Sequence, residues 1–481
     1  MSYLVGIDCG TQSAKVVVFD ERGNIVSRGQ RFLRPMSRPR HGIAVHPDDD
    51  LWDAIADASR EAMAGFVGDP SDIVGIGLCP IRCCKAFLRA DGALVEPVMS
   101  WMDERAYAPY LPDDDALAFA TTASGYLTHR MTGACRDTAA NYIAVQWPID
   151  TDSWQWSADD NDVARFGLRR ELLFDLVMPG DLLGPLTAAA AAATGLPAGT
   201  PVVATANDKA VEMLGAGTLD ERTALVSLGT YIAAMVHGHE NHHSPETFWT
   251  NFASVPHRYL YESFGVRRGM WTLTWFLDLL GDEVAERAVS LGLTREQYLE
   301  QEAAVVPAGS DGLMTVLDWL ATTDAPFRKG MMLGFDARHT RGHVYRSILE
   351  AIALTMKFHV DAMCNELGIE LDEIVVSGGG ANSPLVMQIF ADVFGIDASR
   401  SAAGGGGAAL GAAICAAAAA GVHASIEDAA AVMTRPRETF EPDAVNGELY
   451  DRMADAAYHD IRTHTDALFE RAYPIFHSPD Q

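Results

Sequence analysis

The sequence predicts an α/β protein that folds as two domains. The 481 residues exceed the roughly 250–300 residues at which a single core stops growing. Hydrophobic residues make up 48% and charged residues 21%, a balance typical of a packed chain rather than a disordered one. Each half opens with a buried strand, a small polar turn and a second strand. We therefore expect a duplicated fold with a cleft between the copies, and place the boundary at the polar connector 219–222, giving domains 1–218 and 219–481.

The first half begins with a predicted antiparallel meander. Apolar and β-branched runs give strands at 4–7 and 15–19 and a third strand from residue 25. An acidic start at 47–50 precedes a helix over 51–65, as helix N-termini prefer. Later segments predict buried strands at 73–78 and 201–204 and an alanine-rich helix at 188–193.

The second half repeats the opening pattern. Strands are predicted at 223–228 and 232–236, on either side of a short turn. A long amphipathic helix is expected over 343–367, a buried strand over 374–377 and a helix over 383–394. The Ala- and Gly-rich segment 402–422 favours a loop followed by a helix over a membrane span.

Charge and cysteine content narrow the function classes. Lys and Arg total 36 and Asp and Glu total 65, a net charge of −29, which argues against nucleic acid or an anionic membrane as partner. The seven cysteines are odd in number and lack CxxC spacing, so neither a disulfide framework nor a zinc ribbon is expected. The N-terminus lacks a signal peptide pattern. We expect a cytoplasmic protein whose partner is a small molecule.

Two small polar turns are candidate phosphate loops. Gly10–Ser13 follows Asp8 at the end of the first strand, and Gly229-Thr230 occupies the matching place in the second half. Small residues let backbone N–H groups approach a phosphate, and an Asp at a strand end can hold hydrated Mg²⁺. The alternative is a plain hairpin that Asp8 caps.

A third glycine-rich turn follows the strand at 374–377. Gly378–Gly380 leads into a helix start at Ser383-Pro384, which suits a nucleotide base or phosphate, and Asn382 could bond the base. It is not a GxGxxG dinucleotide motif. The alternative is tight packing of the helix on the strand.

Asp208 is the candidate general base. It follows the buried strand at 201–204 and precedes the small residues Gly215–Gly217. Phosphoryl transfer to an alcohol needs one carboxylate to orient and deprotonate the hydroxyl. The alternative is a helix N-cap.

Taken in order, these segments resemble the FGGY family of carbohydrate kinases, which includes xylulose, ribulose and glycerol kinases, and the branch most similar is the xylulose kinases. The resemblance spans nearly the whole chain. The matching segments are 6–13 with Lys15, 76–106, 126–133, 207–217, 229–230, 330–350 and 377–395.

The resemblance implies an actin-like ATPase (ribonuclease H-like) fold, with ATP and Mg²⁺ as cofactors. It implies that Asp208 is the catalytic base and that Asp8 and Asp208 lie at the metal. The implied cofactor-binding residues are Asp8, Gly10, Thr11, Gln12, Lys15, Gly229, Thr230, Gly379, Gly380 and Asn382. The implied substrate-binding residues are Arg82, Cys83, Trp101, Asp103, Asp208 and Lys209. Members often form dimers, which makes a homodimer a candidate assembly.

The substrate segment departs from the family pattern. Xylulose kinases usually have Met-His where Arg82-Cys83 stands, and glycerol kinases have Arg-Glu. Lys209 stands where Asn or Gln is commoner. One hypothesis is a basic pocket of Arg82, Lys85 and Lys209 for an acidic or strongly polar substrate. The alternative is that Lys209 pairs with Glu212 or Asp208, and a pairing with Asp208 would lower the pKa of that aspartate.

Two further features stand out. Cys79, Cys83 and Cys84 lie within six residues but are interpreted as packing residues, since no histidine spacing accompanies them. Only 25 positions separate Trp101 from Tyr126, a stretch shorter than is usual in the family. A compact stretch implies that part of the substrate-side wall is built differently.

The leading hypothesis is an ATP-dependent kinase acting on a pentulose such as xylulose. A glycerol-like polyol or a sugar acid is the alternative acceptor. A catalytically silent sugar sensor on the same fold is the alternative from another class, and the presence of Asp8, Asp208 and both glycine turns argues against it.

Overall fold

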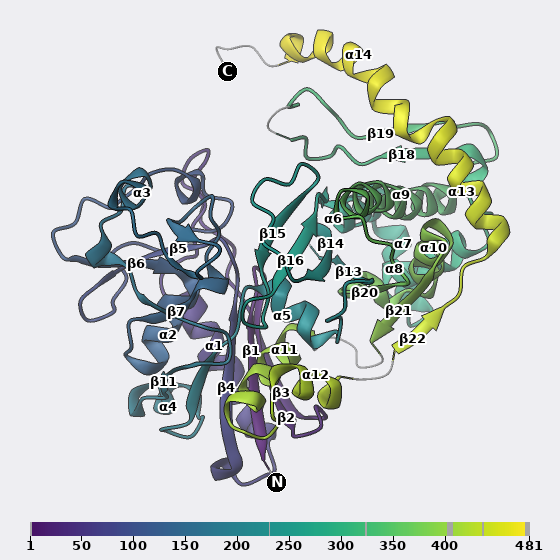
Figure 1. The fold of residues 1–481 in the computed structure, drawn as a ribbon. Helices are drawn as coiled ribbons and strands as arrows, with labels where there is room; N and C mark the ends of the chain where they lie inside the picture. The colour runs from purple at the N-terminus through teal and green to yellow at the C-terminus, as the bar shows by residue number, and fades with distance from the viewer. Residues whose placement is uncertain (1, 230, 323–324, 402–406, 435–436, 477–481) are drawn as a thin grey trace.

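The computed structural model describes residues 2–229, 231–322, 325–401, 407–434 and 437–476. Figure 1 shows two lobes, one formed mainly by the purple and blue first half and the other by the teal and green second half. Each lobe contains a mixed sheet with helices, so the predicted two-domain α/β fold is confirmed.

The first sheet has six strands in the order β11-β12-β4-β1-β2-β3. The first three strands along the chain form the predicted antiparallel meander, and β1 also pairs in parallel with β4, which pairs in parallel with β12. The strands are β1 (Tyr3–Cys9), β2 (Ser13–Asp20), β3 (Ile25–Phe32), β4 (Ile73–Pro80), β11 (Leu182–Pro185) and β12 (Pro201–Ala204).

The second sheet repeats this pattern. Its β13 is antiparallel to β14 and parallel to β20, as β1 is to β2 and β4, so the predicted duplication is confirmed by topology. The order is β15-β16-β14-β13-β20-β21-β22, with β17 also on β14. The strands are β13 (Thr223–Leu228), β14 (Tyr231–Gly238), β15 (Phe248–Phe252), β16 (Tyr259–Ser263), β17 (Val266–Arg267), β20 (Glu373–Ser377), β21 (Asp397–Ser401) and β22 (Arg437–Phe440).

Short strand pairs complete the β structure. These are β5 (Lys85–Arg89) with β6 (Leu117–Thr122), β7 (Arg136–Thr138) with β10 (Asp175–Val177), β8 (Ile149–Asp150) with β9 (Gln155–Trp156), and β18 (Met314–Val316) with β19 (Met331–Leu333). The compact stretch before Tyr126 forms a 3₁₀ turn at Glu104–Tyr107 and then β6, which closes a hairpin with β5.

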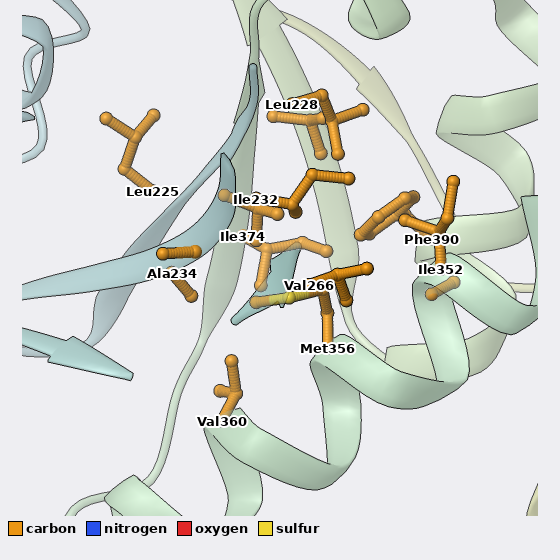
Figure 2. Packing of buried hydrophobic residues seen from close by; sticks show 14 of the residues in the cluster. Leu225, Leu228, Ile232, Ala234, Val266, Ile352, Met356, Val360, Ile374 and Phe390 are labelled. Atoms are coloured by element: carbon orange, nitrogen blue, oxygen red, sulfur yellow. The ribbon is translucent and has the colours of Figure 1, made fainter. Parts of the chain in front are cut away.

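The helices begin and end close to the predicted positions. Those predicted are α1 (Asp50–Gly65), α4 (Ala188–Thr194), α9 (Arg341–Leu367) and α10 (Pro384–Phe394). In Figure 2, side chains of α9 and α10, including Met356 and Phe390, pack against strand residues such as Leu228 and Ile374. The others are α2 (Ala123–Thr132), α3 (Asp160–Arg165), α5 (Asp208–Gly215), α6 (Gly269–Leu279), α7 (Asp282–Ser290), α8 (Arg295–Ala304), α11 (Gly407–Ala419), α12 (Ile426–Met433), α13 (Ala444–Ala456) and α14 (Ile461–Phe476).

Helix α11 crosses back to the first sheet. It follows the second sheet in sequence, yet it packs on β1, β4 and α5 beside the N-terminus (Figure 1). Glycines allow this close approach, because a Cβ on Gly6 would lie 1.8 Å from the Ala409 carbonyl oxygen and one on Gly77 would lie 1.9 Å from that of Ala412. The predicted second domain, 219–481, therefore contributes a helix to the core of the first.

Residues 402–406 of the predicted loop-then-helix segment lie outside the described residues, and the helix follows as α11. Among the residues that the structure describes, no helix has both the length and the apolar character needed to cross a membrane.

Candidate active site

Three predicted site residues meet at one edge of the first sheet. Strands β1, β4 and β12 are parallel, so their carboxyl ends lie together. Asp8 stands near the end of β1, Arg82 follows β4, and Asp208 follows β12. Asp8 and Arg82 are 74 positions apart in the sequence, and Arg82 and Asp208 are 126 apart, yet the fold brings all three to one edge. The Arg82 Nε lies 3.6 Å from an Asp208 carboxylate oxygen.

Asp208 is the first residue of α5, and the preceding residue, Asn207, is the N-cap of this helix. The Asn207 side chain accepts a hydrogen bond from the Ala210 N–H at 3.2 Å and so fills the N-cap position. Asp208 is therefore not needed as a cap. Its side chain keeps 31% of its surface exposed, which leaves a carboxylate oxygen accessible to a substrate.

Burial raises the pKa of Asp208, and the cations of Arg82 and Lys209 oppose that rise. The neighbouring carboxylates of Glu212 and Glu262 raise the pKa of Asp208 further. Lys209 does lower this pKa, as expected, but burial is the larger effect and the net shift is upward. The lysine has another carboxylate partner, and desolvation outweighs its attraction at Asp208.

Asp8 has no side-chain hydrogen bond within the described residues, so it does not cap its hairpin. Burial raises its pKa to about 6; Lys15 lowers the value, while Asp208 and Glu212 raise it. The Asp8 carboxylate is therefore repelled by two neighbouring carboxylates and has no hydrogen-bond donor of its own among the described residues.

Lys209 pairs with Glu212, as the alternative interpretation of this residue expected. Its Nζ donates to the Ser227 Oγ at 2.6 Å and to a Glu212 oxygen at 3.4 Å. Glu212 also accepts from the hydroxyl of Ser377 at 2.6 Å. Burial alone would raise the pKa of Glu212, but Lys209 and the two serine hydroxyls hold it below its usual range.

This cluster joins the two sheets. Ser227 ends β13 beside its parallel partner Ser377 at the end of β20, and both bind a carboxylate on the helix that begins with Asp208. Gly229 and Gly379 each follow two residues after these serines. The candidate base and both second-half glycine turns are therefore fixed to one another through Glu212.

Arg82 is bound by a carboxylate from the other half of the chain. Its Nη1 and Nη2 each donate to an oxygen of Glu262 at 2.7 Å, and Glu262 lies on β16 with a side chain only 1% exposed. Burial alone would raise the pKa of Glu262, but Arg82 holds it below its usual range.

The basic pocket expected from three cations does not form in the described structure. Arg82 and Lys209 are each paired with a carboxylate. Lys85 is buried, with its ammonium 5.3 Å from the centre of the Trp147 ring, and burial lowers its pKa to about 8. In the described part of the chain, these three cations therefore form no shared positive patch beside Asp208.

Three loop glycines leave space for a ligand. A Cβ on Gly10 or Gly229 would meet no atom closer than 3.8 and 3.7 Å respectively, and one on Gly379 would meet none within 4 Å. Their backbone angles do not require glycine. Gly380 differs, because a Cβ there would lie 2.8 Å from the end of the Leu228 side chain, which would have to shift.

The remaining predicted residues are placed as follows. The Trp101 Nε1 donates to the Thr11 hydroxyl at 3.4 Å, which joins the substrate segment to the first phosphate turn. The Asp103 carboxylate is buried and binds Arg105 and the Ala44 N–H. Gln12 and Asn382 are exposed, and Thr230 lies outside the described residues.

Cys83 occupies the left-handed backbone region, with φ of 61°, which is uncommon for a residue with a side chain. Its thiol is hydrogen-bonded to Tyr107, a residue of the compact stretch before Tyr126. That stretch therefore forms part of the wall beside the substrate segment. Burial raises the pKa of the Cys83 thiol to about 11, which makes it a packing group rather than a nucleophile.

Glu262 and the serines at 227 and 377 were not among the predicted site residues, and Glu212 entered only as a partner for Lys209. A signal for Glu262 exists, since it is a single charged residue within an otherwise apolar strand, Tyr259–Ser263. Its partner lies 180 positions away, so the pairing itself has no local signature.

Comparisons with known proteins agree with this geometry. Residues 3–110 match the model of the FGGY family of carbohydrate kinases, N-terminal domain, and residues 224–420 match the C-terminal domain. A sugar kinase of Escherichia coli strain K12, YgcE, is 46% identical over 475 residues, which covers 99% of this chain and 96% of that protein.

The chain belongs to the FGGY family of carbohydrate kinases. An autoinducer-2 kinase of Enterobacter sp. strain 638 is 25% identical over 94% of this chain and 93% of its own. The crystal structure of xylulose kinase from Rhodospirillum rubrum superposes with a TM-score of 0.81 at 25% identity, covering 97% of this chain and all of that one. The chain is therefore a carbohydrate kinase with the actin-like fold of this family.

Proposed function

We propose that the kinase transfers the γ-phosphoryl group of ATP to a hydroxyl of a small sugar or polyol, with a pentulose such as xylulose as the first candidate. One observation carries this proposal. Asp8, Arg82 and Asp208 converge at the edge of the first sheet, and Glu212 links α5, the helix that begins with Asp208, to the glycine turns of the second sheet. Relatives named as sugar and xylulose kinases support the acceptor class.

Asp208 acts as the general base in this proposal. It accepts the proton of the substrate hydroxyl as that oxygen attacks the γ-phosphorus, while the bond to the β-phosphate oxygen breaks and ADP leaves. The carboxylate must be ionised, and Arg82 beside it favours that form. Because the transition state is loose, positioning of the two reactants supplies much of the acceleration.

The residues present fit Mg²⁺ and ATP. Among the described residues no group of three metal-ligating side chains is close enough to hold an ion directly. Asp8 has no hydrogen-bond donor among the described side chains and is repelled by Asp208 and Glu212, so it would hold a hydrated cation that reduces this repulsion. The free space beside Gly10, Gly229 and Gly379 suits close approach of phosphates to the backbone. Bound Mg²⁺ would neutralise phosphate charge during the transfer.

A glycerol-like polyol is the second candidate acceptor. Arg82 is the residue that favours it, because glycerol kinases resemble this chain at that position and xylulose kinases do not. A catalytically silent sugar sensor needs no general base. Asp208 is partly exposed and is not used as a helix cap, which favours an enzyme over a sensor.

A coupled ADP-release screen over ketopentoses, polyols and sugar acids tests the proposal. We expect one acceptor to raise ADP release well above the background hydrolysis of ATP. Asp208→Asn should lower kcat by at least about 10²-fold, the usual contribution of a general base, while ATP binding persists. Unchanged turnover in this variant would contradict the role of Asp208, and no active acceptor would contradict the function.

A further inference from the structure

The Arg82–Glu262 pair is the starting observation, because it places a buried carboxylate of the second half directly on the predicted substrate segment of the first. Both terminal nitrogens of the guanidinium are committed to Glu262 at 2.7 Å. Asn251 holds one of the same carboxylate oxygens with a bond of 3.0 Å from its Nδ2. The orientation of Glu262 is thus fixed from both sides.

This arrangement occupies the part of Arg82 that would recognise an anion. A guanidinium binds a carboxylate through two parallel N–H groups, and here Glu262 already takes that position. An acidic substrate would have to displace Glu262, leaving a buried carboxylate without its cation. The Nε faces Asp208 at 3.6 Å, and each terminal nitrogen keeps a second N–H that can donate a single bond to an uncharged hydroxyl.

The charges around the acceptor position also disfavour an anion. Asp8, Asp208, Glu212 and Glu262 act on one another across this site. The cations opposing them are Lys15, Arg82 and Lys209, and the last two are already paired. Carboxylates therefore outnumber cations here before any phosphate or substrate binds.

We propose that Glu262 is a specificity-determining residue, which withholds the guanidinium of Arg82 from carboxylates and so reserves the acceptor site for an uncharged ketose or polyol. This inference rests on the proposed function, and it opposes the acidic substrate suggested by the sequence. Glu262 acts through Arg82, as a positioning residue, and not on the reacting atoms.

Matched acceptors test it, because an aldonate and its alditol differ only in one terminal group. Gluconate with glucitol and ribonate with ribitol serve as probes, assayed by ADP release and by calorimetric binding. For the wild type we expect each alditol to bind more tightly than its aldonate. In Glu262→Gln the amide can accept only one of the two Arg82 bonds, so the aldonate-to-alditol ratio of affinities should rise at least tenfold.

The double variant Arg82→Met with Glu262→Gln is the matched control, and it should lose this gain because the freed guanidinium is absent. A wild type that binds aldonates as well as or better than alditols overturns the proposal without any variant. An aldonate-to-alditol affinity ratio that stays unchanged in a folded Glu262→Gln protein would also overturn the proposal. If no acceptor gives ADP release but the binding ratios behave as expected, the proposed kinase activity fails and the specificity inference stands.

Discussion

At the residue scale, Asp8 shows how a site residue can oppose stability. Its pKa in the folded chain is about 6, above the ordinary value of 3.8, so folding favours the protonated carboxyl. A raised pKa of this kind contributes stability below about pH 4, and the contribution is lost as the pH rises through 6. At neutral pH the ionised carboxylate therefore destabilises the unliganded protein.

We predict that Asp8→Asn raises the thermal unfolding midpoint at pH 7.5 and abolishes turnover. The free energy of unfolding at pH 7.5 should rise by roughly 1–2 kcal/mol. This is less than the whole pKa shift of Asp8 would give, because part of its carboxylate is exposed. The gain should shrink as the pH falls from 6 to 4, since wild-type Asp8 is then protonated. Differential scanning calorimetry across that range measures it, and a variant less stable than wild type at pH 7.5 would refute the account.

The placement of the candidate site residues on the first sheet could be predicted from the sequence. Asp8, Arg82 and Asp208 each follow or end a strand that reads clearly as buried, and parallel strands bring their carboxyl ends together. The charge partners were harder to predict. The pairing of Arg82 with Glu262, and of Glu212 with Ser377, depends on how two sheets 150 or more positions apart in sequence dock, which no local pattern encodes.

At the element scale, the glycine turns divide into two kinds. Gly378 has φ of +86°, and a Cβ there would lie 2.6 Å from the Leu228 carbonyl oxygen, so the fold requires glycine. Gly379, the next residue, has free space and ordinary backbone angles. The sequence shows a uniform run of three glycines, and only the structure separates Gly379, which has free space around it, from Gly378, where the backbone requires glycine.

Gly379→Ala should therefore leave stability unchanged and weaken nucleotide binding. If the added methyl group clashes with the bound nucleotide and costs about 1.4 kcal/mol of binding free energy, the KM for ATP should rise about tenfold. Gly378→Ala, the neighbouring control, should lower the unfolding midpoint because of its left-handed backbone and close carbonyl contact. An equal loss of stability in both variants would show that Gly379 serves packing rather than the nucleotide.

At the scale of the whole molecule, helix α11 makes the two halves depend on each other. It lies against the first sheet although it follows the second in sequence, and Gly215 of α5 approaches the Gly407 carbonyl oxygen closely enough that a Cβ would lie 1.8 Å away. A division after residue 218, which the polar connector 219–222 suggests, would separate α11 from the surface that it covers.

The contact at Gly77 gives a direct test of this dependence. A Cβ there would lie 1.9 Å from the Ala412 carbonyl oxygen, so Gly77→Ala must displace α11 and, through it, α5 with Asp208. We expect a loss of about 1–3 kcal/mol in stability together with a fall in kcat. Gly75→Ala on the same strand is the matched control, because its Cβ would lie 3.2 Å from the Ala416 oxygen and requires only a small shift. If thermal unfolding and turnover respond alike in both variants, close seating of α11 is not what couples the first sheet to the base.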